Sequence, residues 1–130
     1  MAEARPPPRV LVVDDEPDIV QSLHEWLSAT VTGVTFETAT EPEQALRRIA
    51  EWKPHVVITD YRMPRMDGVQ LAEACPQPRP RFVLITGYPG ADVDRRAYDA
   101  GVDLILSKPV DARALAKVVG QLANAAARQF

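Results

Sequence analysis

The stretch VLVVDDEPDIV, Val10–Val20, contains the unit from which the rest of the chain is built. Its four leading apolar residues predict a short strand buried on both faces, and the residues from Pro17 onward predict a helix. Asp14 and Asp15 stand side by side where the strand ends. Adjacent anions beside a buried strand repel each other and lose hydration, which is costly unless a cation lies close by. The stretch therefore predicts a strand–helix unit with a cation at its junction.

Strand and helix patterns alternate along the whole chain. The strands are expected at residues 10–13, 34–39, 55–59, 82–86 and 103–107. The helices are expected at residues 17–28, 40–52, 68–75, 92–101 and 111–130. Nearly continuous apolar strands separated by helices are typical of a parallel sheet that is covered on both faces. The predicted fold class is therefore α/β, a doubly wound parallel sheet of five strands.

The first two helices carry more detailed predictions. Ile19, Leu23 and Leu27 recur at intervals of four, so they are expected to form the buried face of the first helix. Thr40 and Glu43 have the spacing of a capping box, in which each side chain accepts a hydrogen bond from the backbone at the start of a helix. Both features test where these helices begin and which way they face.

Size and composition point to one ordinary globular domain, with 130 residues, of which 46% are hydrophobic and 25% charged. We expect a flexible lead-in over residues 1–8 and the domain over residues 9–130. The net charge of −3 disfavours nucleic-acid binding, and the single cysteine, Cys75, excludes an internal disulfide. No apolar stretch reaches the roughly 20 residues that cross a membrane, and no secretion signal opens the chain, so a cytoplasmic protein without membrane contact is expected.

Polar side chains collect where the predicted strands end. Asp14 and Asp15 follow the first strand, Asp60 the third, Thr86 ends the fourth, and Lys108 follows the fifth. Ligands of parallel α/β sheets bind outside these carboxyl ends. A compact set of carboxylates suits a hard divalent cation, Mg²⁺ or Mn²⁺, and the lysine adds a second positive charge. A carboxylate beside two cations is suited to attack a phosphoryl group, because both neutralise the transferring oxygens.

Four motifs in this order give the chain a family resemblance: VLVVDDEPDI, VVITDYRMPRMDG, VLITGY and LSKPV. With them the chain resembles, over essentially its whole length, the receiver domain of bacterial two-component response regulators. The resemblance implies a flavodoxin-like sheet with the strand order 2-1-3-4-5 and helices on both faces. It also implies a cis peptide bond between Lys108 and Pro109.

The resemblance assigns a role to each polar residue. Asp60 would be the phosphoacceptor, Asp15 would bind Mg²⁺ directly, and Asp14 would bind it mainly through water. Asp60 itself and the backbone carbonyl of Arg62 would complete the protein ligands of the metal.

Two further roles concern the phosphorylated state, in which Lys108 would bind one phosphoryl oxygen and Thr86 would turn to hydrogen-bond another. Apart from a slow self-dephosphorylation, no enzymatic activity is implied.

Partners follow from the same resemblance. A sensor histidine kinase or a histidine phosphotransfer protein would donate the phosphoryl group, and a downstream output protein or output domain would receive the signal. The chain would be either a stand-alone receiver or the N-terminal module of a longer regulator. A phosphorylation-linked dimer is one possible assembly. The face of the fourth helix, fifth strand and fifth helix, with Arg95, Arg96 and Tyr98, is the expected partner surface.

Three features depart from the family pattern. The third helix is cut short by Pro76, Pro78 and Pro80, which exclude a helix or a central strand in that segment. Ile105 replaces the aromatic switch residue, so the signal is expected to rely on Thr86 and the loop after it. Arg62 and Tyr88 are bulky where the hydrolytic water normally enters, which predicts a slow loss of phosphate from Asp60.

Two alternatives remain at this point. A phosphatase of the haloacid-dehalogenase type also forms an aspartyl phosphate, but it would need an acid where Arg62 stands. A phosphorylation-independent interaction module would use the same fold, although such modules usually lack one of the acidic or lysine residues that this chain retains.

Overall fold

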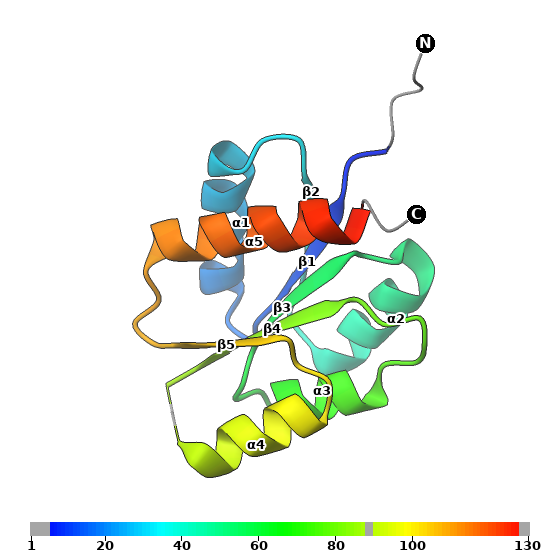
Figure 1. Cartoon of the computed structure of the whole chain (residues 1–130), viewed down its shortest axis with the longest axis vertical. Helices are drawn as coiled ribbons and strands as arrows, with labels where there is room; N and C mark the ends of the chain where they lie inside the picture. The colour runs from blue at the N-terminus through cyan, green and yellow to red at the C-terminus, as the bar shows by residue number, and fades with distance from the viewer. Residues whose placement is uncertain (1–5, 88–89, 128–130) are drawn as a thin grey trace.

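The computed structural model describes residues 6–87 and 90–127, and this part contains a five-stranded parallel sheet and five helices. The strands are β1 (Arg9–Val13), β2 (Thr35–Ala39), β3 (Val56–Asp60), β4 (Arg81–Thr86) and β5 (Leu104–Ser107). The helices are α1 (Pro17–Thr30), α2 (Pro42–Trp52), α3 (Gly68–Ala74), α4 (Ala91–Asp99) and α5 (Ala112–Ala127). The strand order is β2-β1-β3-β4-β5, as predicted, and the chain winds between helices on both faces (Figure 1).

Two apolar layers hold the helices onto the sheet. Alternate residues of a strand point to opposite faces, so Leu11 and Val13 pack with α2, α3 and α4, while Val10 and Val12 pack with α1 and α5. Figure 1 shows these two helix layers above and below the strands. All four of these strand residues are at most 1% exposed, which explains why the strand reads as apolar throughout.

The predicted buried face of α1 is partly wrong. Leu27 is fully buried and Leu23 half-buried, but Ile19 is 40% exposed and Val20 is buried in its place. The helix begins at Pro17, so Ile19 lies in the first turn, where the chain has only just left the edge of the sheet. The residues that face the sheet are therefore spaced by three and four, as a 3.6-residue repeat requires, rather than by four alone.

The capping box predicted at Thr40 and Glu43 does not form. The helix α2 begins at Pro42, with Glu41 as an N-cap that makes no side-chain hydrogen bond. Proline has a fixed φ and lacks an N–H group, so it is favoured at the first position of a helix and sets the start there. The backbone N–H of Thr40 instead donates to the side-chain oxygen of Gln44, at 3.0 Å.

The proline-rich segment has the structure that the sequence predicts. The proline-rich segment from Pro76 to Pro80 contains neither helix nor strand, and α3 ends just before it. The predicted lead-in, residues 1–8, lies outside the described residues except for its three prolines, which have no regular secondary structure. No helix in the described part of the chain combines the length and the apolar character that a membrane span requires.

Candidate functional site at the carboxyl edge of the sheet

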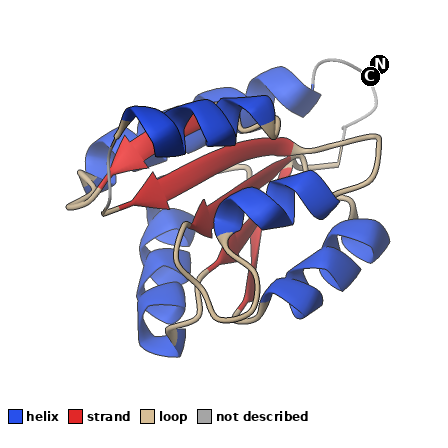
Figure 2. Cartoon of the chain, turned by 90° about the horizontal axis from the view of Figure 1, so that it is seen from below, coloured by secondary structure: helices blue, strands red, loops and turns tan. Residues whose placement is uncertain are grey.

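Three carboxylates meet at one edge of the sheet. Strands β1 and β3 pair in parallel with Val13 opposite Thr59, so the residues that follow them arrive at the same level. Asp14, Asp15 and Asp60 each offer an oxygen, and these oxygens lie within 4.8 Å of one another. Figure 2 shows the strand arrows running in the same sense, with their arrowheads along one edge of the sheet.

Asp14 and Asp60 are almost completely enclosed, with exposures of 7% and 8%. The backbone N–H of Asp14 donates to Ala39 O at 3.2 Å, and its Oδ1 accepts from the backbone N–H of Glu16 at 3.0 Å. Loss of hydration on burial, reinforced by the charge of Asp60, raises the pKa of Asp14 to about 6. The site therefore disfavours its own negative charge until a cation is added.

Lys108 supplies one positive charge within the protein. Its Nζ lies 2.6 Å from Oδ1 of Asp60, and this hydrogen bond raises the pKa of the lysine. The backbone N–H of Lys108 donates to Thr86 O at 2.8 Å, which fixes the lysine against the end of β4. Thr86 itself is fully buried, and the peptide bond from Lys108 to Pro109 is cis, as expected.

The loop after Asp60 is held in place by backbone hydrogen bonds of Tyr61. Tyr61 donates its backbone N–H to Ile85 O, and its carbonyl accepts from the N–H of Gly68, each at 2.8 Å. A Cβ on Gly68 would lie 2.5 Å from Asp60 O and 2.7 Å from Leu84 Cδ1. Only glycine fits here, so this residue lets the start of α3 lie directly against Asp60.

A depression of about 320 Å³ opens at the cluster and is lined by Asp60, Tyr61, Arg62, Gly87 and Lys108. Arg62 therefore lies beside the phosphoacceptor candidate Asp60, as expected. Tyr88 lies outside the described residues. Ile105 is half-buried and packs into the apolar layer on the side of α2, α3 and α4, so it does not line the depression.

The sequence gives no indication of one polar link between α4 and this edge. Arg96 Nη1 donates to Asp67 Oδ2 at 3.2 Å and to Tyr61 Oη at 3.3 Å. Asp67 also caps α3 through a capping box with Gln70. Arg96 was expected on the outer partner surface, but it turns toward the loop after Asp60, whereas Tyr98 is 52% exposed as expected. The contacts join residues that are 29 and 35 positions apart, so no local pattern could reveal them.

The donor set has a clear chemical preference. Clustered carboxylate oxygens suit a hard divalent cation rather than the soft thiolate chemistry of zinc or copper sites. The enclosure of Asp14 and Asp60 and their mutual repulsion fit such an ion. The arrangement can thus place a carboxylate nucleophile, a lysine and a divalent cation around one small hollow.

Comparisons with known proteins agree with this geometry. A family model described as the response regulator receiver domain matches residues 10–120. The protein-glutamate methylesterase/protein-glutamine glutaminase 3 of Rhodopseudomonas palustris is 36% identical over 108 residues, which make up 81% of this chain and 30% of that protein. An uncharacterized response regulatory protein of Vibrio vulnificus is 34% identical over 117 residues, or 89% of this chain and 48% of that protein. The chain thus spans less than half the length of these curated relatives.

Solved structures give the same fold. The signal receiver domain of an HD domain-containing protein from Pseudomonas fluorescens is 30% identical, with a TM-score of 0.83 over 95% of this chain and 99% of that one. A response regulator receiver domain from Clostridium thermocellum is 28% identical, with a TM-score of 0.84 and the same coverage of both chains.

Proposed function

We propose, because the chain belongs to the response regulator receiver domain family, that Asp60 accepts a phosphoryl group from a phosphohistidine. The donor would be a sensor histidine kinase or a histidine phosphotransfer protein of a two-component system. The observation that carries this proposal is the enclosed carboxylate of Asp60, 2.6 Å from Lys108 Nζ and clustered with two further aspartates. No other group of three or more such ligands occurs in the described residues.

The transfer is a displacement at phosphorus. An oxygen of Asp60 forms the new P–O bond, the P–N bond of the phosphohistidine breaks, and the leaving imidazole takes a proton from solvent. Asp14, Asp15, Asp60 and the backbone carbonyl of Arg62 would hold Mg²⁺, or Mn²⁺, whose charge offsets that of the phosphoryl oxygens when it is bound. Lys108 exchanges its contact with Asp60 for one with a phosphoryl oxygen, and the Thr86 hydroxyl binds another.

The direct test uses a small phosphoryl donor. Purified protein is incubated with acetyl phosphate, with and without Mg²⁺, and the intact mass is measured. We expect one added phosphoryl group in the presence of Mg²⁺ and none in Asp60→Asn. Asp111→Asn is the matched control, because this exposed carboxylate caps α5 through Oδ1, a role that asparagine retains. Unchanged labelling of Asp60→Asn would refute the proposal.

The output is proposed to leave through α4. Arg96 ties this helix to Asp67 and to Tyr61, the residue next to Asp60, and Tyr98 is exposed on its surface. Because Ile105 has no hydroxyl to relocate, Thr86 would carry the change from the phosphoryl group to the loop before α4. Thr86→Ala should still be phosphorylated but should lose most of the phosphorylation-dependent chemical-shift changes around Tyr98. Undiminished changes would mean that the signal takes another route.

Setting and alternatives complete the proposal. We assign residues 9–130 to one receiver domain of a cytoplasmic regulator, acting alone or joined to an output domain, with no catalytic turnover beyond slow self-dephosphorylation. Arg62 lines the depression at the position where a haloacid-dehalogenase-type phosphatase would need an acid, so turnover of phosphate esters is not expected. A phosphorylation-independent module would keep its partner binding in Asp60→Asn, whereas the proposed receiver would lose the phosphorylation-dependent part.

A further inference from the structure

A groove of about 610 Å³ lies at the amino edge of the sheet, where the strands begin. Its floor is apolar and buried, formed by Ile49, Pro54, Pro80 and Ala126. Four cationic side chains line it, and no carboxylate does: Arg9, Lys53, Arg79 and Arg81. We call this hollow the basic groove. The chain as a whole carries a net charge of −3, so this local excess of positive charge is not an average property of the surface.

Among these cations, Arg9 gives the strongest indication of a binding site. Within the described residues its Nε is a buried side-chain donor without a hydrogen-bond partner, and its guanidinium forms no ion pair. The group lies over the ring of Trp52, 5.9 Å from the centroid. A buried donor left unpaired costs about 1–3 kcal/mol, and a charged donor costs more. The two terminal nitrogens of Arg9 are not among the buried atoms without a partner and make no side-chain hydrogen bond or ion pair in the described residues, so an anion in the groove would meet the guanidinium through them rather than through Nε.

The other cations differ in how far the protein already uses them. Lys53 is exposed at the end of α2 and forms no ion pair in the described part of the chain. Arg81 makes one loose pair, 3.5 Å from Asp103, with both side chains partly exposed. Arg79 is already used within the protein, since its Nη2 donates to the carbonyls of Ala72 and Ala100 at the ends of α3 and α4. Arg9 and Lys53 are thus the cations available to a ligand.

We propose that the basic groove binds an acidic, partly apolar segment of a partner polypeptide. Carboxylates match the fork of the Arg9 guanidinium, and apolar side chains between them match the floor. The wall between Pro76 and Pro80 is rich in proline, which offers few backbone N–H groups, so recognition rests on side chains. A nucleic acid is disfavoured because the net negative charge of the chain repels a long polyanion.

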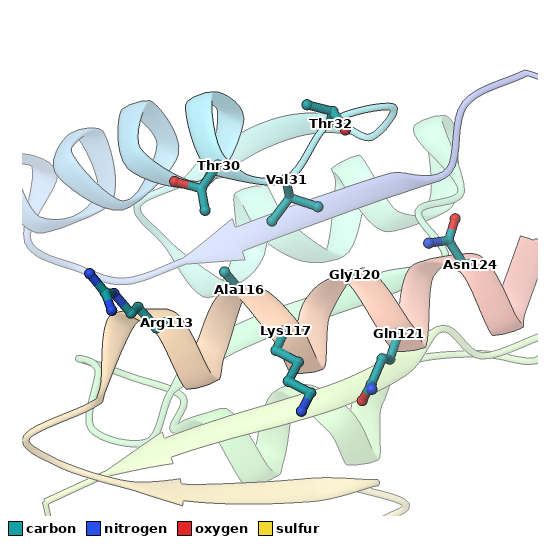
Figure 3. A pocket seen from close by; sticks show the side chains of 9 residues that line it. All are labelled: Thr30, Val31, Thr32, Arg113, Ala116, Lys117, Gly120, Gln121 and Asn124. Carbon is teal, nitrogen blue, oxygen red and sulfur yellow. The ribbon is translucent and has the colours of Figure 1, made fainter.

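A second hollow is also lined by cations, and comparing it with the basic groove shows which further feature distinguishes the groove. This hollow, of about 630 Å³, lies between the end of α1 and α5, and in Figure 3 Val31 points toward Ala116 and Gly120 across it. Two cations, Arg113 and Lys117, line it as well. Within the described residues, however, it holds no buried polar atom without a partner. Cations alone therefore do not make it a site.

The test measures the binding of a synthetic peptide by fluorescence anisotropy at low ionic strength. The probe is a short, fluorescein-labelled peptide that alternates glutamate with leucine and is blocked at both ends. We expect saturable binding that added salt weakens, because the contacts are ionic. Arg9→Gln should weaken binding about tenfold and Lys53→Asn about threefold. Asparagine is chosen because Lys53 has a left-handed backbone, with φ of 55°.

Matched controls separate this site from general charge effects and from the carboxyl edge. Arg113→Gln removes an exposed cation at the start of α5 and should leave the affinity unchanged. Asp60→Asn should also leave it unchanged, so failure of the phosphoacceptor proposal and failure of this one are distinguishable. Should Arg9→Gln not fold, Lys53→Asn and the salt dependence decide. The proposal is overturned if the peptide does not bind, if Arg113→Gln weakens binding as much as Arg9→Gln, or if an oligonucleotide binds through Arg9 and the peptide does not.

Discussion

The amino ends and the carboxyl ends of β1, β3 and β4 differ sharply in the sign and the arrangement of the charged side chains around them. At the carboxyl ends of β1 and β3, beside the end of β4, the oxygens of three aspartates lie within 4.8 Å of one another, and Lys108 reaches one of them. At the amino ends, the cations of the basic groove are spread along a rim with no carboxylate in the lining. Between the two edges the strands are almost entirely apolar and buried. A parallel sheet thus separates two chemistries that the net charge of −3 conceals.

The difference lies in enclosure as much as in sign. Asp14 and Asp60 are enclosed at the ends of two paired strands, with exposures of 7% and 8%, so their repulsion cannot relax by moving apart. At the amino edge the side chains of Lys53 and Arg81 extend toward solvent, which screens their charges. The carboxyl edge therefore stores unfavourable energy that a cation can release, and the amino edge stores little beyond the unpaired Arg9.

The tightest packing at the carboxyl edge gives the largest expected effect. Gly68→Ala would place a Cβ against the backbone oxygen of Asp60, which cannot rotate away, so we expect a loss of about 3 kcal/mol in the free energy of unfolding. Gly90→Ala is the control, because a Cβ there meets nothing within 4 Å and its φ is in the extended range. Urea denaturation of both variants makes the comparison. Equal stability of the two variants would show that the loop is free to move.

The second-largest effect is expected when a negative charge is removed from the cluster of aspartates at the carboxyl edge. Asp14→Asn, measured without divalent cations at pH 7, should raise the free energy of unfolding by about 2 kcal/mol, because the native carboxylate is ionised there against a raised pKa. The asparagine oxygen can still accept from the N–H of Glu16. Added Mg²⁺ should stabilise the wild type but stabilise the variant much less.

Asp111→Asn, which removes an exposed carboxylate, should change neither property. A destabilised Asp14→Asn would mean that the carboxylate is worth more to the apo protein as a hydrogen-bond acceptor than it costs in desolvation and repulsion.

The sequence was sufficient for the alternating elements and for the residues that the strand ends bring together. A buried parallel strand is apolar on both faces, and its end marks where the first polar residue must lie, so Asp14, Asp60 and Thr86 could be placed from one short pattern each. The strand order, by contrast, came from the family resemblance, because no local pattern says which strands are neighbours. The exposed Ile19 was missed because an interval of four drifts around a helix whose true repeat is 3.6 residues.

Contacts between distant elements could not be predicted from the sequence. The link from Arg96 to Asp67 and the closure of two helix ends by Arg79 join segments through long side chains, whose directions depend on the finished packing. The basic groove was missed for the same reason. Its cations lie at the ends of different elements, and each one taken alone is an ordinary surface residue. A set of acids is easier to recognise, since the ends of parallel strands bring them to one place.

Arg62 gives a smaller effect, on the lifetime of the phosphorylated state. It lines the depression around Asp60, and we expect it to restrict the approach of water to the phosphoryl group. Arg62→Ala should speed the decay of phospho-Asp60 about five- to thirty-fold, which corresponds to about 1–2 kcal/mol. The decay is followed by intact mass after removal of the phosphoryl donor. Arg95→Ala, an exposed arginine of α4, is the control, and equal rates for the two variants would exclude a shielding role.

Lowering the pH gives the smallest expected effect on stability. It changes the contributions of Asp14, at the carboxyl edge, and of His55, at the amino edge, in opposite directions. The pKa of Asp14 is raised to about 6 from 3.8, so the folded protein binds the proton more tightly than the unfolded chain does. Its contribution to stability therefore falls as the pH rises through this window. At the amino edge, burial and then the charge of Arg9 lower the pKa of His55 below 6.5, while Nδ1 accepts the backbone N–H of Arg9 at 2.9 Å. The unfolded chain then binds the proton more tightly, so the contribution of His55 falls as the pH drops below 6.5.

In the wild type the contributions of Asp14 and His55 to stability oppose each other. Together, therefore, these two groups should change the melting temperature only slightly between pH 7.5 and pH 5.0. Both measurements are made without divalent cations. Asp14→Asn removes the contribution that favours acid, so its melting temperature should drop more than that of the wild type when the pH is lowered. His55→Asn removes the opposite contribution, so its melting temperature should drop less, or rise. Because asparagine can still accept from the N–H of Arg9, the second variant tests titration rather than the loss of a hydrogen bond. Shifts of the same sign in both variants would show that the two ends of the strands do not differ in the way the structure indicates.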